Sequence, residues 1–163
     1  MLALAIGLLI VGLLVLLMLA VAPASLPRVS WPLVILFVIL VTPFHELIHT
    51  ILQPSFGLSD RTTLGLCVTM MGVYTHYEGA ISRNRHIAIG LAPFVALSIA
   101  PVLLMAACEI DPPLLTNAAI ANGLGCSADI IGATLLLLQA PPASEIRNKG
   151  WHTYWRMTAQ PRP

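Results

Sequence analysis

Charged side chains are scarce in this sequence. Lys, Arg, Asp and Glu make up only 9% of the 163 residues, whereas 58% are hydrophobic, and ordinary soluble domains carry about a quarter charged residues. The formal net charge of +1 also excludes the strongly basic surface with which nucleic-acid-binding proteins attract phosphates. The composition therefore predicts an integral membrane protein that is surrounded by membrane lipid and has no nucleic-acid partner.

Cysteines are few and internal repeats are missing. Cys67, Cys108 and Cys126 show no C-x-x-C spacing, which argues against a disulfide framework and against a thiolate zinc site. We expect each of them to be a small buried apolar residue. The lack of repeated segments argues against the repeat architecture that is common in secondary transporters.

Long apolar runs dominate what is present. A helix needs about 20 apolar residues to cross a bilayer, and four runs approach or exceed that length. The first has no charged residue, and because it lacks a basic n-region we expect a retained helix rather than a signal peptide. We predict one all-α polytopic membrane domain over residues 1–163, with four transmembrane helices at about residues 1–22, 31–53, 86–108 and 114–140. Pro93 and Pro101 predict that the third is bent or broken.

Two segments do not read as spans. Residues 54–85 carry β-branched and aromatic residues around Gly72, which indicates a possible short β-hairpin between spans 2 and 3. Such a hairpin could hold a substrate by strand addition, and a loop on the membrane surface explains the segment equally well. The tail, residues 141–163, combines Trp151 and Trp155 with basic neighbours, so we expect it to rest at the lipid interface.

The basic residues predict the orientation. With four spans, all but Arg28 fall on the side of the membrane that also holds both termini. By the positive-inside rule, that side is the cytoplasm. We therefore expect a multi-pass protein of the cell membrane with both termini in the cytoplasm.

The second run contains the most informative motif, His45-Glu46-Leu47-Ile48-His49. In the pattern H-E-x-x-H, the two histidines share one helix face and can bind a single metal, while the glutamate can act as general base on water at that metal. A chain of this composition would contain the pattern by chance roughly 0.004 times. Ionisable residues in a membrane span are costly and point to function, and Pro43 should locally loosen the helix around them.

Asp129 is the acid of the fourth run and falls at the depth of the motif. Counted from the starts of the two runs, a helical rise puts His45 at about 21 Å, His49 at about 27 Å and Asp129 at about 24 Å. This predicts Asp129 as the third protein ligand of a tetrahedral zinc site with one open position, although a hydrogen-bonded acid in a helix interface would also fit.

Asn122 shares a helix face with Asp129, because seven residues are close to two turns. It is a candidate catalytic residue that donates a hydrogen bond to an oxyanion, and a polar contact between helices is the alternative. The other histidines, His76, His86 and His152, have no metal-ligand spacing to the motif. Of these, His76 would approach the site if the hairpin folds inward.

These features together resemble a known family. The H-E-x-x-H near the end of a span, the segment Gly79–Arg83 leading into Leu91-Ala92-Pro93, and the Asn-x₆-Asp pattern are similar to small bacterial and archaeal membrane proteins described as "putative zincin peptidases", themselves distantly similar to site-2 proteases. The resemblance covers roughly residues 40 to 156. It implies a prokaryotic protein in which zinc is bound by two histidines and Asp129, with Glu46 as the general base.

The surroundings of the third ligand depart from that pattern. Site-2 proteases usually have an Asn-Pro-Asp-Gly type sequence there, and this chain has Ser127-Ala128-Asp129-Ile130. A recognisable substrate-sorting domain is also missing, so the membrane-protein or peptide substrate stays open, as does the oligomeric state. We expect a zinc-dependent intramembrane metalloprotease that hydrolyses peptide bonds in or near the bilayer. A metal or proton transporter and a noncatalytic metal-stabilised membrane adaptor are the alternatives.

Overall fold

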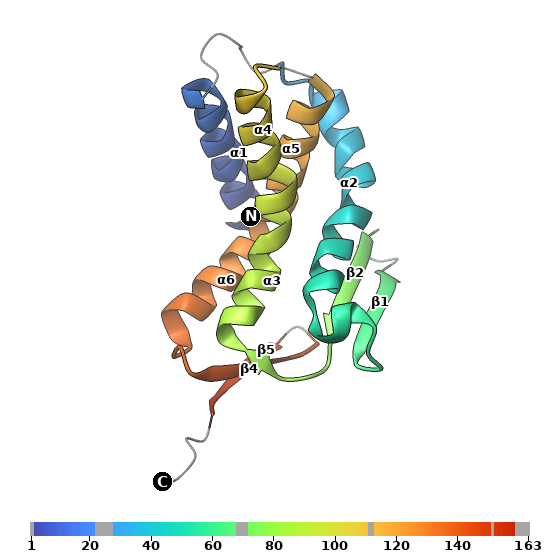
Figure 1. Ribbon diagram of the computed structural model, residues 1–163, viewed down its shortest axis with the longest axis vertical. Coiled ribbons are helices and arrows are strands. Elements are labelled where there is room, and N and C mark those ends of the chain that lie inside the picture. Colours follow the sequence, from blue (N-terminus) through green and yellow to red (C-terminus); the bar gives the residue numbers. More distant parts are fainter. Residues whose placement is uncertain (1, 22–27, 68–71, 111–112, 151, 159–163) are drawn as a thin grey trace.

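The fold is mostly helical, with two small sheets at one end of a helical bundle (Figure 1). The computed structural model describes residues 2–21, 28–67, 72–110, 113–150 and 152–158. Within these residues, three helical stretches are long and apolar enough to cross a membrane, or four if a bent pair of helices counts as one span. The three are α1 (Leu2–Val21), α2 (Trp31–Leu52) and the stretch Arg83–Ala107.

The third stretch does not break at its prolines. It consists of α3 (Arg83–Phe94), the π-helical turn η2 (Val95–Ile99) and α4 (Ala100–Ala107). Pro101 has no amide hydrogen to continue the α-helical ladder. The helix accommodates Pro101 with one π-helical turn, in which the Ala100 amide bonds the Val95 carbonyl five residues back.

The bend lies instead in the fourth run, where no proline predicts it. α5 (Pro113–Gly125) and α6 (Ser127–Gln139) meet at an angle of 49°. Their backbone hydrogen bonds continue across the bend, since Cys126 N donates to Asn122 O and Cys126 O accepts from Ile130 N, both at 3.0 Å. The transmembrane helix expected at about residues 114–140 therefore consists of two helices, and the bend redirects the one that carries Asp129.

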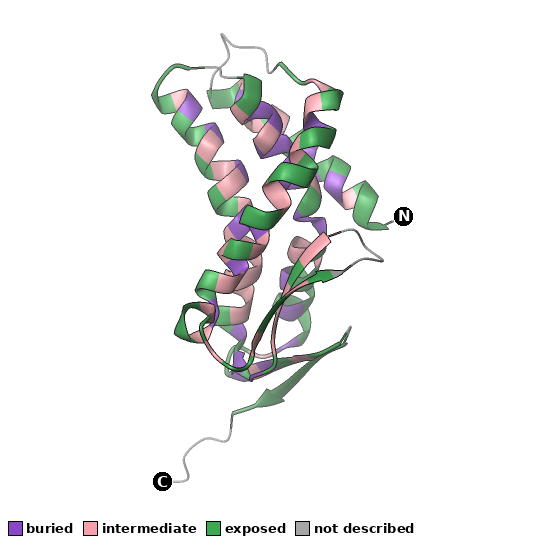
Figure 2. Cartoon of the chain, turned by 90° about the vertical axis from the view of Figure 1, so that its right-hand side faces the viewer, coloured by how far each residue is buried: buried purple, intermediate pink, exposed green. Residues whose placement is uncertain are grey.

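The helices pack around a small apolar core at the end of the bundle away from the sheets (Figures 1 and 2). Its buried residues come from α1, α2, α4 and α5: Val11, Met18, Val34, Val102, Met105, Ala119, Ile120 and Ala121. The outward faces of α1 and α2 also carry large exposed apolar side chains, such as Leu9 and Ile39. An apolar surface of this kind matches a lipid environment.

The first sheet runs beside the lower half of α2 (Figure 1). After α2, the turn η1 (Pro54–Gly57) reverses the chain, and strands β1 (Thr62–Cys67) and β2 (Gly72–Tyr77) pair antiparallel, with Leu64 opposite Thr75. The segment between spans 2 and 3 thus contains two strands. β2 is the strand that lies against α2.

The second sheet closes the same end of the bundle. Its order is β3 (Ile81–Ser82), β4 (Ser144–Lys149) and β5 (His152–Met157), all antiparallel. Ile146 is fully buried against Leu136 and Ala140. The all-α prediction is therefore incomplete, because half of the expected interfacial tail forms strands; Trp151 lies outside the described residues.

Two arginines at the start of α3 hydrogen-bond to the ends of α6 and α2. Arg83, which is 8% exposed, donates Nε to Leu136 O at 3.2 Å and Nη2 to Leu137 O at 3.1 Å. Arg85 Nη2 donates to Leu52 O at 3.1 Å. These carbonyls at the C-terminal ends of α6 and α2 carry partial negative charge, which the guanidinium groups complement, and Leu136 O also accepts from the Ala140 amide at 3.1 Å. The three helices that build the site described next are thereby joined at their ends.

Candidate metal centre

Helix α2 places both motif histidines on its inner face. His45 and His49 are 9% and 7% exposed, and their Nε2 atoms lie 3.1 Å apart. The spacing of four residues is close to one helical turn, so the second ring lies directly below the first. Two buried imidazole nitrogens therefore point at the same place.

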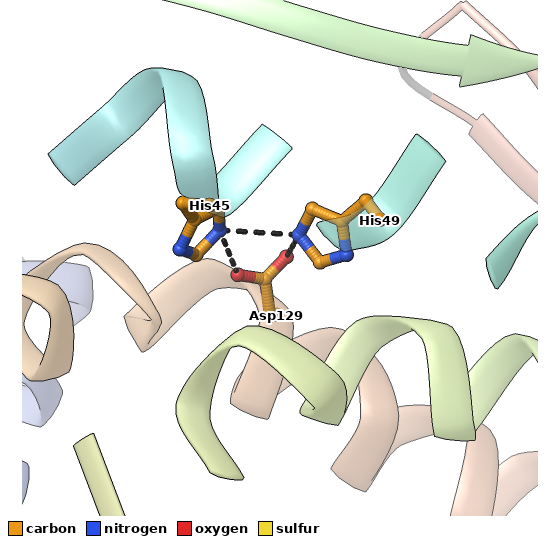
Figure 3. A group of neighbouring side chains, drawn as sticks. All are labelled: His45, His49 and Asp129. Atoms are coloured by element: carbon orange, nitrogen blue, oxygen red, sulfur yellow. Dashed lines mark hydrogen bonds and ion pairs between the residues drawn. The ribbon is translucent and has the colours of Figure 1, made fainter. Parts of the chain in front are cut away.

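Asp129 reaches that place from the first turn of α6 (Figure 3). Its Oδ2 lies 3.2 Å from His45 Nε2, and its Oδ1 lies 3.5 Å from His49 Nε2. With one donor atom taken from each residue, the three atoms lie within 4.8 Å of one another. The structure thus brings together the three residues that the sequence selects as ligands, from two separate helices.

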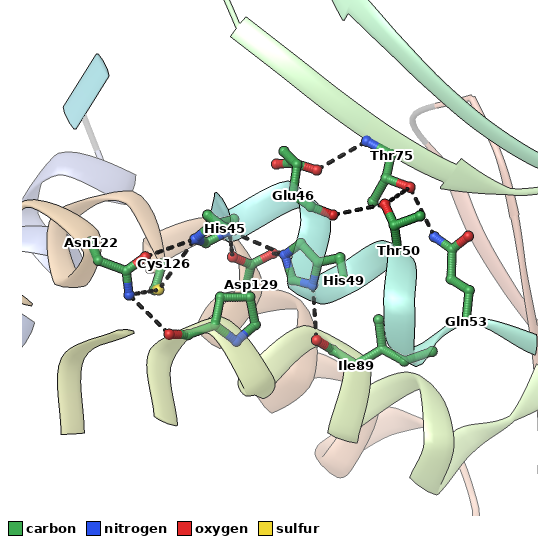
Figure 4. Close-up of polar contacts among 11 residues, drawn as sticks. His45, Glu46, His49, Thr50, Gln53, Thr75, Ile89, Asn122, Cys126 and Asp129 are labelled. Atoms are coloured by element: carbon green, nitrogen blue, oxygen red, sulfur yellow. Dashed lines mark hydrogen bonds and ion pairs between the residues drawn. The ribbon is translucent and has the colours of Figure 1, made fainter. Parts of the chain in front are cut away.

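The protonation of His45 follows from its neighbours (Figure 4). Its Nδ1 lies 3.0 Å from Asn122 Oδ1. The Asn122 amide nitrogen already donates to Pro93 O at 3.0 Å and to Ser98 Oγ at 2.9 Å, so its oxygen is the atom that faces the ring. An amide oxygen only accepts, hence His45 carries a hydrogen on Nδ1 and turns Nε2 toward Asp129.

His49 is oriented in the same way by the backbone of α3. Its Nδ1 lies 2.8 Å from Ile89 O, which can only accept, so Nδ1 is again the protonated nitrogen. Metal-binding histidines almost always donate their second ring nitrogen to a carbonyl or carboxyl group, which fixes the tautomer and the ring orientation. Both rings have such a partner.

This arrangement fits a metal ion. Two imidazole nitrogens and a carboxylate converge, and these are groups that bind zinc in proteins. Ligand atoms of a tetrahedral zinc ion, at zinc–nitrogen distances of about 2.0–2.1 Å, are about 3.3 Å apart. The two Nε2 atoms are 3.1 Å apart, and each lies close to a different oxygen of Asp129, at 3.2 and 3.5 Å. Two histidines and a carboxylate leave one tetrahedral position open, as in catalytic zinc sites.

Glu46 lies beside the histidines but turns toward β2. Its Oε2 accepts a hydrogen bond from the Thr75 amide at 2.9 Å. The hydroxyl of Thr75 is in turn 3.0 Å from Thr50 Oγ1 and accepts from Gln53 Nε2 at 3.1 Å. The motif helix and β2 are therefore joined at the level of the glutamate.

A cavity of about 260 Å³ opens next to these groups. It is lined from α2, β2, α3, α6 and β4, by residues that include Glu46, His49, Tyr74, Thr75, His76, Tyr77, His86, Asp129 and Asn148. A second cavity, of about 390 Å³, reaches Asp129 and His86 from the side of α6 and β5. Asp129 thus lines both cavities, and His49 lines the first of them.

His76, expected to approach the site if the hairpin folds inward, lines the first cavity, and so does His86, for which the sequence predicted no role. The sequence did not indicate Thr75, since a backbone amide leaves no pattern in it. His152 lies on exposed β5 and does not line it. Asn122 is 3% exposed, and both amide hydrogens are already donated to Pro93 and Ser98. This geometry favours a positioning role behind His45 over direct contact with an oxyanion.

The comparisons with known proteins give one match. No curated protein and no solved structure matches the chain. A family model with the description "Putative zincin peptidase" matches residues 38–144, well over half of the chain, and this region contains both histidines, Glu46 and Asp129. The chain therefore belongs to the putative zincin peptidase family.

Proposed function

We propose that the protein is a zinc-dependent metallopeptidase that hydrolyses peptide bonds in or beside the bilayer. The observation that carries this proposal is the convergence of His45 Nε2, His49 Nε2 and the Asp129 carboxylate next to a cavity that Glu46 also lines. Membership of a family described as zincin peptidases supports the same chemistry. Glu46 and the ligands are proposed to act as one site.

The residues divide the work of hydrolysis. Zinc held by the two histidines and Asp129 would supply a Lewis acid for the scissile carbonyl and acidify water beside it. The Glu46 carboxylate takes the proton from that water and passes it to the leaving amine. Asn122 and the Ile89 carbonyl hold the imidazole rings in the orientation that this requires.

The free edge of β2 supports a peptide as substrate. β2 pairs with β1 on one side and borders the cavity on the other. An extended peptide that adds to a strand edge gains main-chain hydrogen bonds with little demand on its side chains. A scissile bond bound along β2 would pass Glu46, because Thr75 touches that carboxylate.

We further propose that the sheets lie on the cytoplasmic side of a cell membrane. Helices of sufficient length and apolar composition support the membrane location. The sheet-bearing end carries most of the described basic residues, namely Arg61, Arg83, Arg85, Arg147, Lys149 and Arg156, and Arg28 lies at the other end. The positive-inside rule then assigns the sheet end to the cytoplasm, with the site near that surface.

The test compares Glu46→Gln with the wild type after purification. The variant should keep one zinc per chain and lose about 10²–10⁴-fold in cleavage of membrane-protein or peptide substrates, the usual contribution of a general base. Glu78→Gln, an exposed glutamate just after β2, is the matched control and should cleave normally. Full activity of Glu46→Gln would overturn the assignment.

The other two outcomes identify the alternatives. Zinc or proton movement across vesicles by Glu46→Gln would favour a transporter. A wild type that holds zinc and binds a partner protein, but cleaves nothing, would favour a noncatalytic adaptor.

A further inference from the structure

The backbone of β2 offers one of its two edges to the cavity. In the β1–β2 pair, the Glu78 amide bonds the Arg61 carbonyl beyond the last paired residues. Along an antiparallel strand, the backbone N–H and C=O groups of successive residues point to alternate edges. The backbone groups of His76 and Tyr74 therefore also point toward β1. Val73, Thr75 and Tyr77 therefore direct their amides and carbonyls to the opposite edge.

The Thr75 amide, in the middle of this free edge, already donates a hydrogen bond. Thr75 N donates to Glu46 Oε2 at 2.9 Å. A carboxylate on a backbone amide makes a charge-assisted hydrogen bond, which is stronger than a bond between neutral groups. A substrate strand that pairs along β2 needs the same hydrogen for one of its own carbonyls, so substrate and glutamate compete for it.

The strand cannot avoid this competition by moving aside. The Thr75 hydroxyl is within hydrogen-bond distance of Thr50 Oγ1 and Gln53 Nε2 on the motif helix. Gln53 is 5% exposed, and Thr50 is bonded to the Glu46 carbonyl at 2.8 Å. These contacts hold the Thr75 amide at the level of the carboxylate whether or not the carboxylate accepts from it.

We propose that the Thr75 amide positions Glu46 in the resting protein and passes to a substrate carbonyl when an extended peptide pairs with β2, which frees the carboxylate for catalysis. This rests on the proposed peptidase function and narrows its substrate class. The substrate is a segment of extended main chain that reaches across Val73, Thr75 and Tyr77. Peptides too short to pair with β2 leave Glu46 on the amide and are cleaved slowly.

The test removes the Thr75 amide hydrogen and corrects for the hydroxyl that is lost with it. Thr75→Pro is suitable because this N–H points away from β1, and proline is tolerated at strand edges in that position. Thr75→Val keeps the amide and removes the hydroxyl, so it is the matched control. In detergent or nanodiscs, with zinc content confirmed, kcat and KM are measured on a short peptide and on a long unstructured peptide around the same cleavage site.

Removal of the amide should have opposite effects on the two peptides. The short peptide should be cleaved several-fold faster by Thr75→Pro than by the wild type, because Glu46 is no longer held. The long peptide should show a KM raised by about fivefold with kcat preserved, the effect of one lost main-chain hydrogen bond. Thr75→Val lacks the same hydroxyl and keeps the amide, so an effect that it shares with Thr75→Pro comes from the hydroxyl, and only the difference between the two variants is assigned to the amide. A kcat lowered on both peptides by Thr75→Pro would overturn the proposal, because the amide would then orient Glu46 throughout the reaction.

Hydrogen exchange tests the contact without catalysis. In Glu46→Ala the amide of Thr75 should exchange about tenfold faster than in the wild type, since it has lost its acceptor. An unchanged rate would overturn the proposal even if Thr75→Pro does not fold. A zinc-loaded wild type that cleaves neither peptide would instead overturn the proposed peptidase function, so the two failures are distinguishable.

Discussion

His45 donates its Nδ1 hydrogen to Asn122 Oδ1 across 3.0 Å, and this bond ties the motif helix to α5. The Asn122 amide nitrogen continues the link to the third helical stretch through Pro93 O and Ser98 Oγ. Three separate segments thus determine the direction of one imidazole ring. Groups behind a metal ligand usually change affinity or activity 10–100-fold when they are removed.

Asn122→Ala should therefore weaken zinc binding by about 10–100-fold. The ring of His45 loses the acceptor that selects its tautomer, and its N–H stays buried without a partner. Competition with a chromogenic chelator measures the affinity. Asn117→Ala is the matched control, because Asn117 is equally buried on α5 but bonds Ser30 N and the Arg28 and Pro113 carbonyls. It should destabilise the protein without changing zinc affinity, and an equal loss of affinity in both variants would contradict the positioning role.

Zinc should stabilise the fold against heat. The converging side chains of His45, His49 and Asp129 can hold a cation only in the folded chain, so the cation stabilises the folded state by mass action. Ligand at 100 times its Kd adds about 2.7 kcal/mol to the free energy of unfolding, which thermal scans with zinc and with a chelator would show as a higher Tm. In Asp129→Asn most of the zinc-dependent rise in Tm should disappear. Asp60→Asn, which changes an exposed aspartate outside the ligand cluster, should keep that rise. A Tm insensitive to zinc in the wild type would contradict a metal site here.

Arg83 should be essential for stability. Arg83→Leu loses charge-assisted hydrogen bonds to Leu136 O and Leu137 O at the end of α6 and should lower the free energy of unfolding by about 2–4 kcal/mol. Arg83→Lys should lower the free energy of unfolding by less than Arg83→Leu does. A lysine keeps the charge but lacks the planar guanidinium that reaches both carbonyls. Arg147→Leu, on the exposed face of β4, should change stability by less than about 0.5 kcal/mol. Equal effects of the two leucine variants would contradict the capping role.

The ligand cluster could be predicted because it depends on local helix geometry. A separation of four residues puts His45 and His49 on one face, and a fixed rise per residue puts Asp129 at their depth. The estimate tolerated the unexpected bend at Cys126, because Asp129 lies within one turn of it. A bend earlier in α5 would have moved the acid away from the histidines.

The rest of the site depends on contacts between distant segments. The Thr75 amide and the Ile89 carbonyl are backbone groups, so no side-chain pattern marks them. The strands of the tail form a local hairpin, from Ser144 opposite Met157 to Lys149 opposite His152. They escaped prediction because β5 is exposed along its whole length and only Ser144 and Ile146 of β4 are buried, which leaves little alternation of apolar and polar residues in the sequence.

Gly57 should be irreplaceable for the approach of β2 to the motif helix. Its φ of +75° is a left-handed conformation, and a Cβ there would lie 2.5 Å from Thr50 Cγ2 and 2.6 Å from Thr50 O. Gly57→Ala should therefore cost at least about 2 kcal/mol from backbone strain and crowding. Because Thr50 also contacts the Thr75 hydroxyl, exchange of the β2 amides should rise as well. Gly12→Ala, on α1 with nothing within 4 Å of the added Cβ, is the control and should leave Tm and exchange unchanged; if both variants behave alike, the turn does not set the position of β2.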